Sequence, residues 1–248
     1  MKLAATCLQL DVGNSSAKWR LVKDGQVIAR GKYLTEDEVS RQMLLDSTAR
    51  PDQIWIASVA APAAEAALSA MLVQHWGVVP WFARTQARTG NLRNSYKDPA
   101  RMGVDRWLVM LAANKRVSGR ACVVDAGSAL TIDMVDASGR HEGGYIIPGP
   151  ALMERALLLD TDRVRFAEEV EYGLSPGTST AEAVRHGIAL AQAGAVAKAI
   201  ERSGEPGPAL LFCGGGGEVL MQLLGQGGSY IPDLVFEGLE VMAACSPE

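Results

Sequence analysis

A carboxylate followed by a turn of small polar residues lies near the start of the chain, where a phosphate group could be bound. Asp11 follows a short apolar run, the turn 13–16 reads Gly-Asn-Ser-Ser, and Lys18 comes next. Glycine has no Cβ, so the backbone N–H groups and hydroxyls of such a turn can approach an anion. Asp11 could hold Mg²⁺ through water, and Lys18 could contact a phosphate. An ordinary hairpin turn explains the same residues.

The same pattern occurs a second time. Asp125 lies 114 residues after Asp11, and Gly127 lies 114 residues after Gly13. The offset continues downstream, where Leu21 corresponds to Val135 and Gly25 to Gly139. A constant offset through two turns predicts two duplicated halves that face each other across a cleft, each contributing one Asp-Gly turn.

A third candidate site combines an acidic and a basic residue at the start of a helix. Gly103 and Val104 precede Asp105 and Arg106, and the apolar run 108–113 predicts a buried helix. An aspartate in a first helical turn is explained by capping and by the helix dipole. Beside Gly103 and an arginine, it equally resembles a general base next to an anion-binding group. The polar segment 84–101, which contains five basic residues, is either a solvated connection or a substrate-binding loop.

The elements that would position these residues alternate between strands and helices. Residues 18–22 and 26–29 predict strands joined by a Lys-Asp-Gly turn, which with the first strand form an antiparallel meander. A helix at 36–45, a parallel strand at 54–59, a helix at 63–74 and a strand at 78–82 make this half α/β. In the second half, hydroxyl residues 178–180 precede a helix at 181–199, and a strand at 210–213 runs into four glycines.

Composition excludes several classes of protein. With 248 residues, of which 48% are hydrophobic and 21% charged, the chain is globular and forms one large or two smaller domains. It has no apolar run long enough to span a bilayer and no signal-peptide pattern, so we expect a cytoplasmic protein. A net charge of −4 argues against a nucleic-acid surface. The four scattered cysteines and His141 read as structural residues rather than metal ligands.

Together these motifs resemble the type III pantothenate kinases, within the acetate and sugar kinase, Hsp70 and actin superfamily. The resemblance lies in the first phosphate motif at 11–18, the Gly-x-Asp-Arg motif at 103–106, the second phosphate motif at 125–129 and the helix start at 179–184. It implies an α/β fold of duplicated actin-like, ribonuclease H-like halves, 1–118 and 119–248. Each half would be a mixed sheet flanked by helices, with a cleft between the domains.

The resemblance also implies an activity, which is ATP-dependent phosphorylation of pantothenate to 4'-phosphopantothenate, the first step of coenzyme A biosynthesis. The enzyme would be a homodimer that uses Mg²⁺, bound through water at Asp11, and K⁺ or NH₄⁺ at Asp125. Asp105 would be the proton acceptor. The residues implied to bind ATP and its phosphates are Asp11, Val12, Gly13, Asn14, Ser15, Ser16, Ala17, Lys18 and Ser128. Those implied to bind pantothenate are Tyr96, Gly103, Val104, Asp105, Arg106 and Thr180.

Two departures and two alternatives accompany this interpretation. Ser128 replaces the family's usual Thr and keeps the hydroxyl, whereas Gly216 stands where relatives often carry Asp, which leaves ribose and base contacts at that turn open. The alternatives are a non-catalytic accessory or regulatory protein of the same fold, and an enzyme acting on another hydroxyl acceptor or on water. The apolar helix 181–199 predicts a symmetric dimer that a charge at Ala189 or Ala193 would break.

Overall fold

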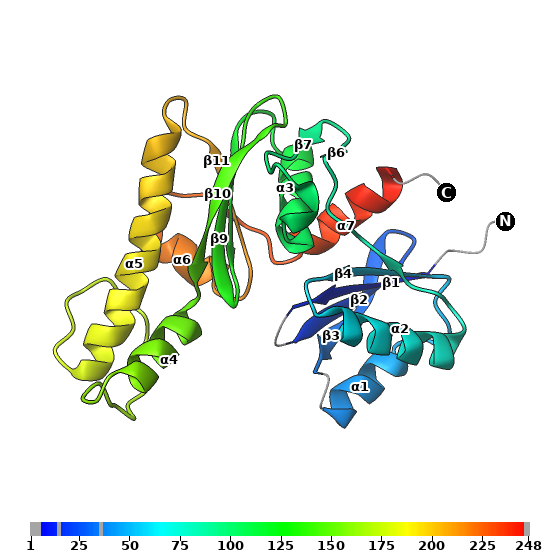
Figure 1. The fold of residues 1–248 in the computed structure, drawn as a ribbon, viewed down its shortest axis with the longest axis horizontal. Coiled ribbons are helices and arrows are strands. Elements are labelled where there is room, and N and C mark those ends of the chain that lie inside the picture. Colours follow the sequence, from blue (N-terminus) through cyan, green and yellow to red (C-terminus); the bar gives the residue numbers. More distant parts are fainter. Residues whose placement is uncertain (1–5, 14–15, 35–36, 246–248) are drawn as a thin grey trace. The chain divides into compact units, whose positions relative to one another are not determined.

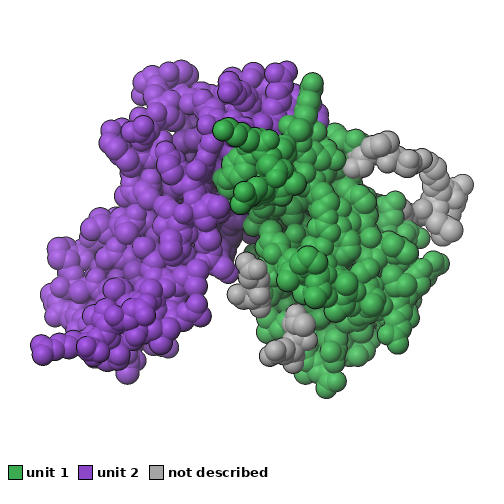
Figure 2. All heavy atoms as spheres, in the orientation of Figure 1, with its two compact units in different colours: residues 1–89, 96–112, 235–248 green, residues 90–95, 113–234 purple. Residues whose placement is uncertain are grey.

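The computed structural model describes residues 6–13, 16–34 and 37–245. Asn14 and Ser15, which belong to the predicted first phosphate turn, lie outside these residues. The chain forms two compact units (Figure 2). Unit 1 comprises residues 1–89, 96–112 and 235–248, and unit 2 comprises residues 90–95 and 113–234. The predicted halves, 1–118 and 119–248, differ from these units at 90–95, 113–118 and 235–248, and the division into halves stays a prediction.

Unit 1 contains a mixed five-stranded sheet of order β3-β2-β1-β4-β5. Its first three strands are antiparallel and the last two continue parallel to β1, as the sequence predicts. The β2–β3 turn has Asp24 and Gly25 at φ values of 52° and 74°, a left-handed backbone that favours an Asp-Gly hairpin. The strands are β1 (Thr6–Val12), β2 (Ala17–Lys23), β3 (Gln26–Tyr33), β4 (Gln53–Ser58) and β5 (Trp81–Phe82).

Helices cover the unit 1 sheet because its strands alternate in polarity. Leu8 and Leu10 of β1 are fully buried in a core shared with two helices, α1 (Glu38–Leu45) and α2 (Pro62–Trp76). Asp37 caps α1, and Gly77 ends α2 in a left-handed conformation. The remaining elements that lie wholly or mostly in this unit are β6 (Arg88–Thr89), a 3₁₀ turn (Pro99–Arg101), α3 (Val104–Arg116) and α7 (Leu234–Cys245). β7 (Leu92–Arg93) belongs to unit 2.

The late helix α7 completes unit 1. Gln9 and Arg20 alternate with the core residues of their strands, and the Arg20 Nε–H donates to Gln9 Oε1 at 2.7 Å. Arg20 Nη2 also donates to Glu240 of α7 at 2.8 Å. Gly238 lies so close to α3 that a Cβ there would overlap the Leu108 carbonyl. Helix α7 therefore packs into the unit that the start of the chain forms.

Unit 2 repeats the topology of unit 1, with a sheet of order β10-β9-β8-β11-β12 and the same strand directions. This repetition confirms the predicted duplicated α/β fold. Helices α5 and α6 lie on one face of the sheet (Figure 1), where Val196 and Leu220 join Phe212 in the core. The elements are β8 (Ala121–Ala126), β9 (Ala129–Val135), β10 (His141–Pro148), α4 (Pro150–Asp160), α5 (Thr180–Ser203), β11 (Ala209–Cys213), α6 (Gly217–Leu224) and β12 (Ser229–Tyr230).

The predicted constant offset of 114 residues breaks at the first turn. Asp11 pairs with Lys18, seven residues further on, whereas Asp125 pairs with Thr131, only six residues further on. The second Asp-Gly turn is therefore one residue shorter. The strand predicted at 78–82 shrinks to Trp81–Phe82, because Pro80 has no N–H for a strand ladder. No helix within the described parts of the chain is long and apolar enough to cross a membrane.

Candidate active site

The first Asp-Gly turn closes on itself at the end of β1. The Gly13 N–H donates to the Ser16 carbonyl at 3.0 Å, and a Cβ on Gly13 would lie 3.3 Å from that oxygen. Asp11 is partly exposed and lies opposite Lys18 of β2. Val12 is also partly exposed, Ser16 is exposed, and Ala17 is buried at the start of β2. A carboxylate and an ammonium group thus lie opposite each other at the base of one turn.

Asp105 lies in the first turn of α3 with its carboxylate turned back onto the backbone. Its Oδ1 accepts a hydrogen bond of 2.7 Å from the N–H of Arg106. A Cβ on Gly103 would lie 2.5 Å from the same oxygen, so only glycine leaves room for the carboxylate there. Val104, the first helical residue, is buried. Gly103 and the helix N-terminus therefore fix one carboxylate oxygen of Asp105.

Arg106 and Tyr96 form a pair beside this carboxylate. The Arg106 side chain is buried, and its Nη1–H donates to the Tyr96 hydroxyl at 2.8 Å. The guanidinium carbon also lies 5.7 Å from the Tyr96 ring centroid, within range of a cation–π contact. Because a guanidinium has five N–H donors in a planar fork, this pair is suited to orienting a carboxylate or phosphate.

The predicted basic segment 84–101 is partly structural. Arg84 forms an ion pair with Glu65 of α2 through two hydrogen bonds, which lower the pKa of the Glu65 carboxyl. Thr85 Oγ1 donates to the Met102 carbonyl at 2.9 Å, which ties the start of the segment to its end. Arg84 thus anchors the start of the segment to α2, and Tyr96 of this segment contacts Arg106.

Unit 1 brings the Asp11 turn and Asp105 to the same edge of its sheet. Strands β1 and β4 are parallel, so their carboxyl ends meet there. The Val59 N–H after β4 donates to the Val12 carbonyl at 3.0 Å. A Cβ on Gly103 would lie 4.0 Å from the Val59 Cγ1. Val59 therefore links the two motifs, as expected for a ligand site at the carboxyl ends of parallel strands.

The second Asp-Gly turn lies in unit 2 at the end of β8. The Gly127 N–H donates to the Ala129 carbonyl at 3.0 Å, and Ser128 is exposed. The Ser128 carbonyl accepts a hydrogen bond of 3.1 Å from Gly149, where a Cβ would lie 2.5 Å from that oxygen. Gly149 thus permits the segment after β10 to pack directly on the turn that follows Asp125.

The turn of four glycines also packs on Asp125. Gly214 has a φ of +77°, and a Cβ there would overlap the Asp125 Oδ1 and the Ala126 backbone. The Gly216 N–H donates to the Ala126 carbonyl at 2.9 Å, and the Tyr230 hydroxyl donates to the Gly214 carbonyl at 3.1 Å. Close packing on the second Asp-Gly turn therefore explains Gly214.

Thr180 is the first residue of α5 but not its cap. Ser179 is the N-cap, and its Oγ accepts from the Glu182 N–H at 3.2 Å. Glu182 in turn accepts from the Thr178 N–H and hydroxyl, and these hydrogen bonds lower the pKa of its carboxyl. Thr180 is exposed and lines an apolar groove of about 830 Å³ between α4 and α5. Thr180 is therefore accessible from this groove.

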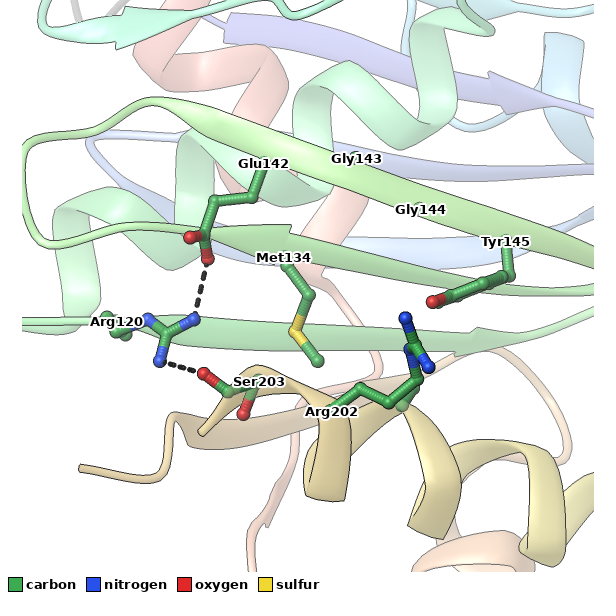
Figure 3. A pocket seen from close by; sticks show the side chains of 9 residues that line it. Arg120, Met134, Glu142, Gly143, Gly144, Tyr145, Arg202 and Ser203 are labelled. Carbon is green, nitrogen blue, oxygen red and sulfur yellow. Dashed lines mark hydrogen bonds and ion pairs between the residues drawn. The ribbon is translucent and has the colours of Figure 1, made fainter. Parts of the chain in front are cut away.

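A polar hollow of about 350 Å³ in unit 2 contains none of the predicted site residues. Figure 3 shows Arg120 on one side of it and Arg202 and Tyr145 on the other. Arg120 donates to Glu142 at 2.9 Å and to the Ser203 carbonyl at 2.6 Å. Its charge is thus largely engaged within the unit.

Sequence reasoning missed a buried polar chain in unit 2. His141 and Asp133 are both fully buried, with His141 Nε2 3.0 Å from Asp133 Oδ1. His141 Nδ1 lies 2.9 Å from the Ser95 hydroxyl. The one signal was the single carboxylate in the stretch 130–135, which is apolar apart from Thr131. Across the described ranges, no group of three or more His, Cys, Asp or Glu side chains could hold a metal ion.

Comparisons of the sequence agree on one family. The family model described as type III pantothenate kinase matches residues 7–202. The type III pantothenate kinase of Hahella chejuensis is 36% identical over 242 residues, which cover 97% of this chain and 98% of that protein. The enzyme of the same name from Thiobacillus denitrificans is 37% identical over 237 residues, with 94% and 95% covered.

Solved structures show the fold. A Campylobacter jejuni protein assigned to the Baf family of transcriptional activators aligns with a TM-score of 0.60 at 22% identity, covering 96% of this chain and 97% of that one. A Sinorhizobium meliloti protein assigned as a 2-dehydro-3-deoxygalactonokinase aligns with a TM-score of 0.57 at 15% identity, covering 96% and 98%. These likenesses support the predicted actin-like α/β architecture.

Proposed function

Because the chain belongs to the type III pantothenate kinase family, we propose that Asp105, beside the Arg106–Tyr96 pair of unit 1, activates the hydroxyl group of the substrate pantothenate. The protein is an ATP-dependent pantothenate kinase that acts at the first step of coenzyme A biosynthesis. The observation that carries the proposed site is the shared sheet edge, where Val59 links the Asp11 turn to Gly103.

The proposed chemistry needs one proton acceptor and several positioned charges. Phosphoryl transfer passes through a loose transition state, so the protein mainly orients groups and stabilises charge. Asp105 accepts the hydroxyl proton of pantothenate as the oxygen attacks the γ-phosphorus of ATP in line. Arg106, oriented by the Tyr96 hydroxyl at 2.8 Å, pairs with the substrate or with the charge that develops on the phosphate.

The two Asp-Gly turns are proposed to bind the phosphates. In unit 1, Gly13 and Lys18 flank the anion, and the partly exposed Asp11 holds Mg²⁺ through water. The donors at this turn are oxygens, which fit a hard cation, and the metal when bound neutralises charge on the phosphates. In unit 2, the exposed Ser128 contributes its hydroxyl. Together with Val12, Ser16 and Ala17, these residues form the proposed ATP-binding set.

A monovalent cation is proposed at Asp125. This carboxylate is partly exposed and lies beside the second turn, where backbone carbonyls of Ala126 and Ser128 are also close by in sequence. An all-oxygen set of this kind suits K⁺ or NH₄⁺. The cation would offset the negative charge of Asp125 next to the phosphates.

A homodimer is proposed, with α5 at the interface. Leu190 of α5 is 59% exposed, and Leu159, at the end of α4, is 71% exposed. These side chains add exposed apolar surface on the two helices that form the Thr180 groove, and a second copy would cover it. Ala189 and Ala193, expected at the interface from the sequence, are instead buried within unit 2.

A cytoplasmic location is also proposed.

The proposed function is tested by ADP release from the purified protein with ATP and three classes of acceptor. We expect release with pantothenate and none above background with sugars or with water alone. Turnover with a sugar or water would favour the alternative acceptors. Absence of ADP release with every acceptor, for a folded protein supplied with Mg²⁺ and K⁺, would favour a non-catalytic regulatory role.

A further inference from the structure

The Asp133–His141 pair is costly to bury. Both side chains are fully buried, on the sheet face that lies away from the core packed under α5 and α6. Removing two ionisable groups from water is unfavourable, and apolar side chains of similar volume are often neutral or stabilising in their place. Stability alone therefore does not explain why this pair is buried. A role in holding other residues in position would explain it.

The protonation pattern follows from the partners of His141. An ionised carboxylate only accepts hydrogen bonds, so the imidazole Nε2 carries the proton donated to Asp133 at 3.0 Å. In the neutral ring the Nδ1 then accepts, and the Ser95 hydroxyl donates to it at 2.9 Å. Asp133 thus fixes the ring and its tautomer, and the ring in turn fixes Ser95.

Ser95 ends a segment that is fastened to unit 2 along its length. The Arg93 N–H donates to the Gly139 carbonyl at 2.8 Å. Asn91 accepts from Asn114 Nδ2 at 2.6 Å, and a Cβ on Gly139 would lie 2.8 Å from the Asn91 carbonyl oxygen. His141 supplies the last of these fastenings, immediately before the chain continues to Tyr96.

We propose that the Asp133–His141–Ser95 chain is a positioning element of the pantothenate site. It holds the backbone at residue 95, from which Tyr96 extends to orient Arg106. This inference rests on the proposed function, because it takes Tyr96 and Arg106 as substrate-binding residues. None of the three residues in the chain touches the reacting atoms, and they act through the placement of Tyr96.

The test compares Ser95→Ala with Ser95→Thr in the full-length enzyme. Ser95 itself is exposed, so the alanine variant should stay folded, with only a small fall in the unfolding temperature from the lost hydrogen bond to His141. Loss of one positioning hydrogen bond should raise the KM for pantothenate on the order of 2- to 10-fold while the KM for ATP stays unchanged. Ser95→Thr retains the hydroxyl and should restore the wild-type KM. A matched control is Ser138→Ala, which removes a hydroxyl bonded to Asp136 in the nearby β9–β10 turn and should change neither KM.

A third variant separates failure of this inference from failure of the proposed site. Tyr96→Phe removes the hydroxyl that accepts from Arg106 and should raise the KM for pantothenate directly. If Tyr96→Phe raises that KM and Ser95→Ala does not, the positioning role is overturned and the proposed site stands. If Tyr96→Phe has no effect, the proposed site is overturned. An equal rise in both KM values for Ser95→Ala would indicate general loosening and would also overturn the inference.

Nitrogen NMR of the imidazole gives a readout that is independent of activity. In ¹⁵N-histidine-labelled enzyme, His141 should show a protonated Nε2 and an accepting Nδ1. The Nδ1 resonance should shift in Ser95→Ala and not in Ser138→Ala. A His141 Nδ1 resonance that is the same in wild type and Ser95→Ala would contradict the hydrogen bond on which the proposal depends.

Discussion

The Asp105 carboxylate accepts a hydrogen bond of 2.7 Å from the backbone N–H of Arg106. This bond ties the proposed base and the proposed anion-binding residue to the same helical turn. An amide oxygen can accept the same hydrogen bond, so the contribution of charge and basicity can be separated from that of structure.

Asp105→Asn should therefore fold normally and lose turnover. The asparagine amide cannot accept the hydroxyl proton, and loss of one positioned base typically costs on the order of a hundred- to ten-thousand-fold in rate. The kcat from ADP release and the thermal unfolding temperature measure the two halves of this prediction. Near wild-type kcat in the folded variant would reduce Asp105 to a helix-capping residue.

The proposed monovalent-cation site predicts a dependence on the identity of the salt. Activity with Na⁺ as the only monovalent cation should fall well below activity with K⁺, because the larger ion loses its water more cheaply in an oxygen cage. Rates are compared at matched ionic strength. Asp125→Asn should abolish most of the difference between the two salts, and equal wild-type rates in both would count against the site.

The proposed dimer predicts that two neighbouring residues of α5 behave differently. Leu190→Glu places a charge on an exposed position and should give a folded monomer with impaired pantothenate phosphorylation. Ala189→Glu places the charge in the buried face and should destabilise unit 2 itself. Light scattering and thermal unfolding distinguish the outcomes. A wild-type monomer with full activity at assay concentration would overturn the dimer.

Two helical glycines offer a matched test of packing. Gly238→Ala should lower the free energy of unfolding by roughly 1–3 kcal/mol, because the added methyl overlaps the Leu108 carbonyl of α3. Gly194 of α5 is exposed and has nothing within 4 Å of an added Cβ. Gly194→Ala should therefore stabilise by up to about 1 kcal/mol. Denaturant unfolding measures both, and equal effects would contradict the close α3–α7 packing.

The cysteines should differ sharply in reactivity. Burial raises the pKa of both the Cys7 and the Cys122 thiol to about 12, so their reactive thiolates form only near that pH. Cys213 is buried as well, and Cys245 is exposed. At pH 8 a thiol reagent should modify Cys245 rapidly and the other three only after unfolding. Mass spectrometry identifies the modified residue. Rapid labelling of Cys122 in the native protein would contradict its burial in the core of unit 2.

Local patterns were enough to predict the strand order near each Asp-Gly turn. The meander around the Asp24-Gly25 turn, the parallel strand β4 and the duplication all follow from alternation and turn chemistry. Relations between distant segments could not be predicted in this way. The sequence of α7 is apolar around most of its circumference, so its period does not identify the α3 surface that it contacts.

The contacts of the candidate site likewise fall into local ones, which the sequence predicts, and contacts between distant segments, which it does not. The start of α3 places Asp105 and Arg106 beside Gly103, because the three residues are close in sequence. Tyr96 reaches Arg106 through a loop, and periodicity does not specify that contact. His141 and Asp133 pair across an irregularity in the β9–β10 register, which no period in either strand encodes.

The position of α7 sets an order of events during synthesis. Residues 235–245 leave the ribosome after all of unit 2, yet they supply Glu240 for Arg20 and the Gly238 surface against α3. Unit 2 can thus complete its core while unit 1, whose sheet was translated first, still lacks α7. A nascent chain released before residue 235 would carry a finished second unit and an incomplete first one, which makes the early half of the protein the natural client of a chaperone.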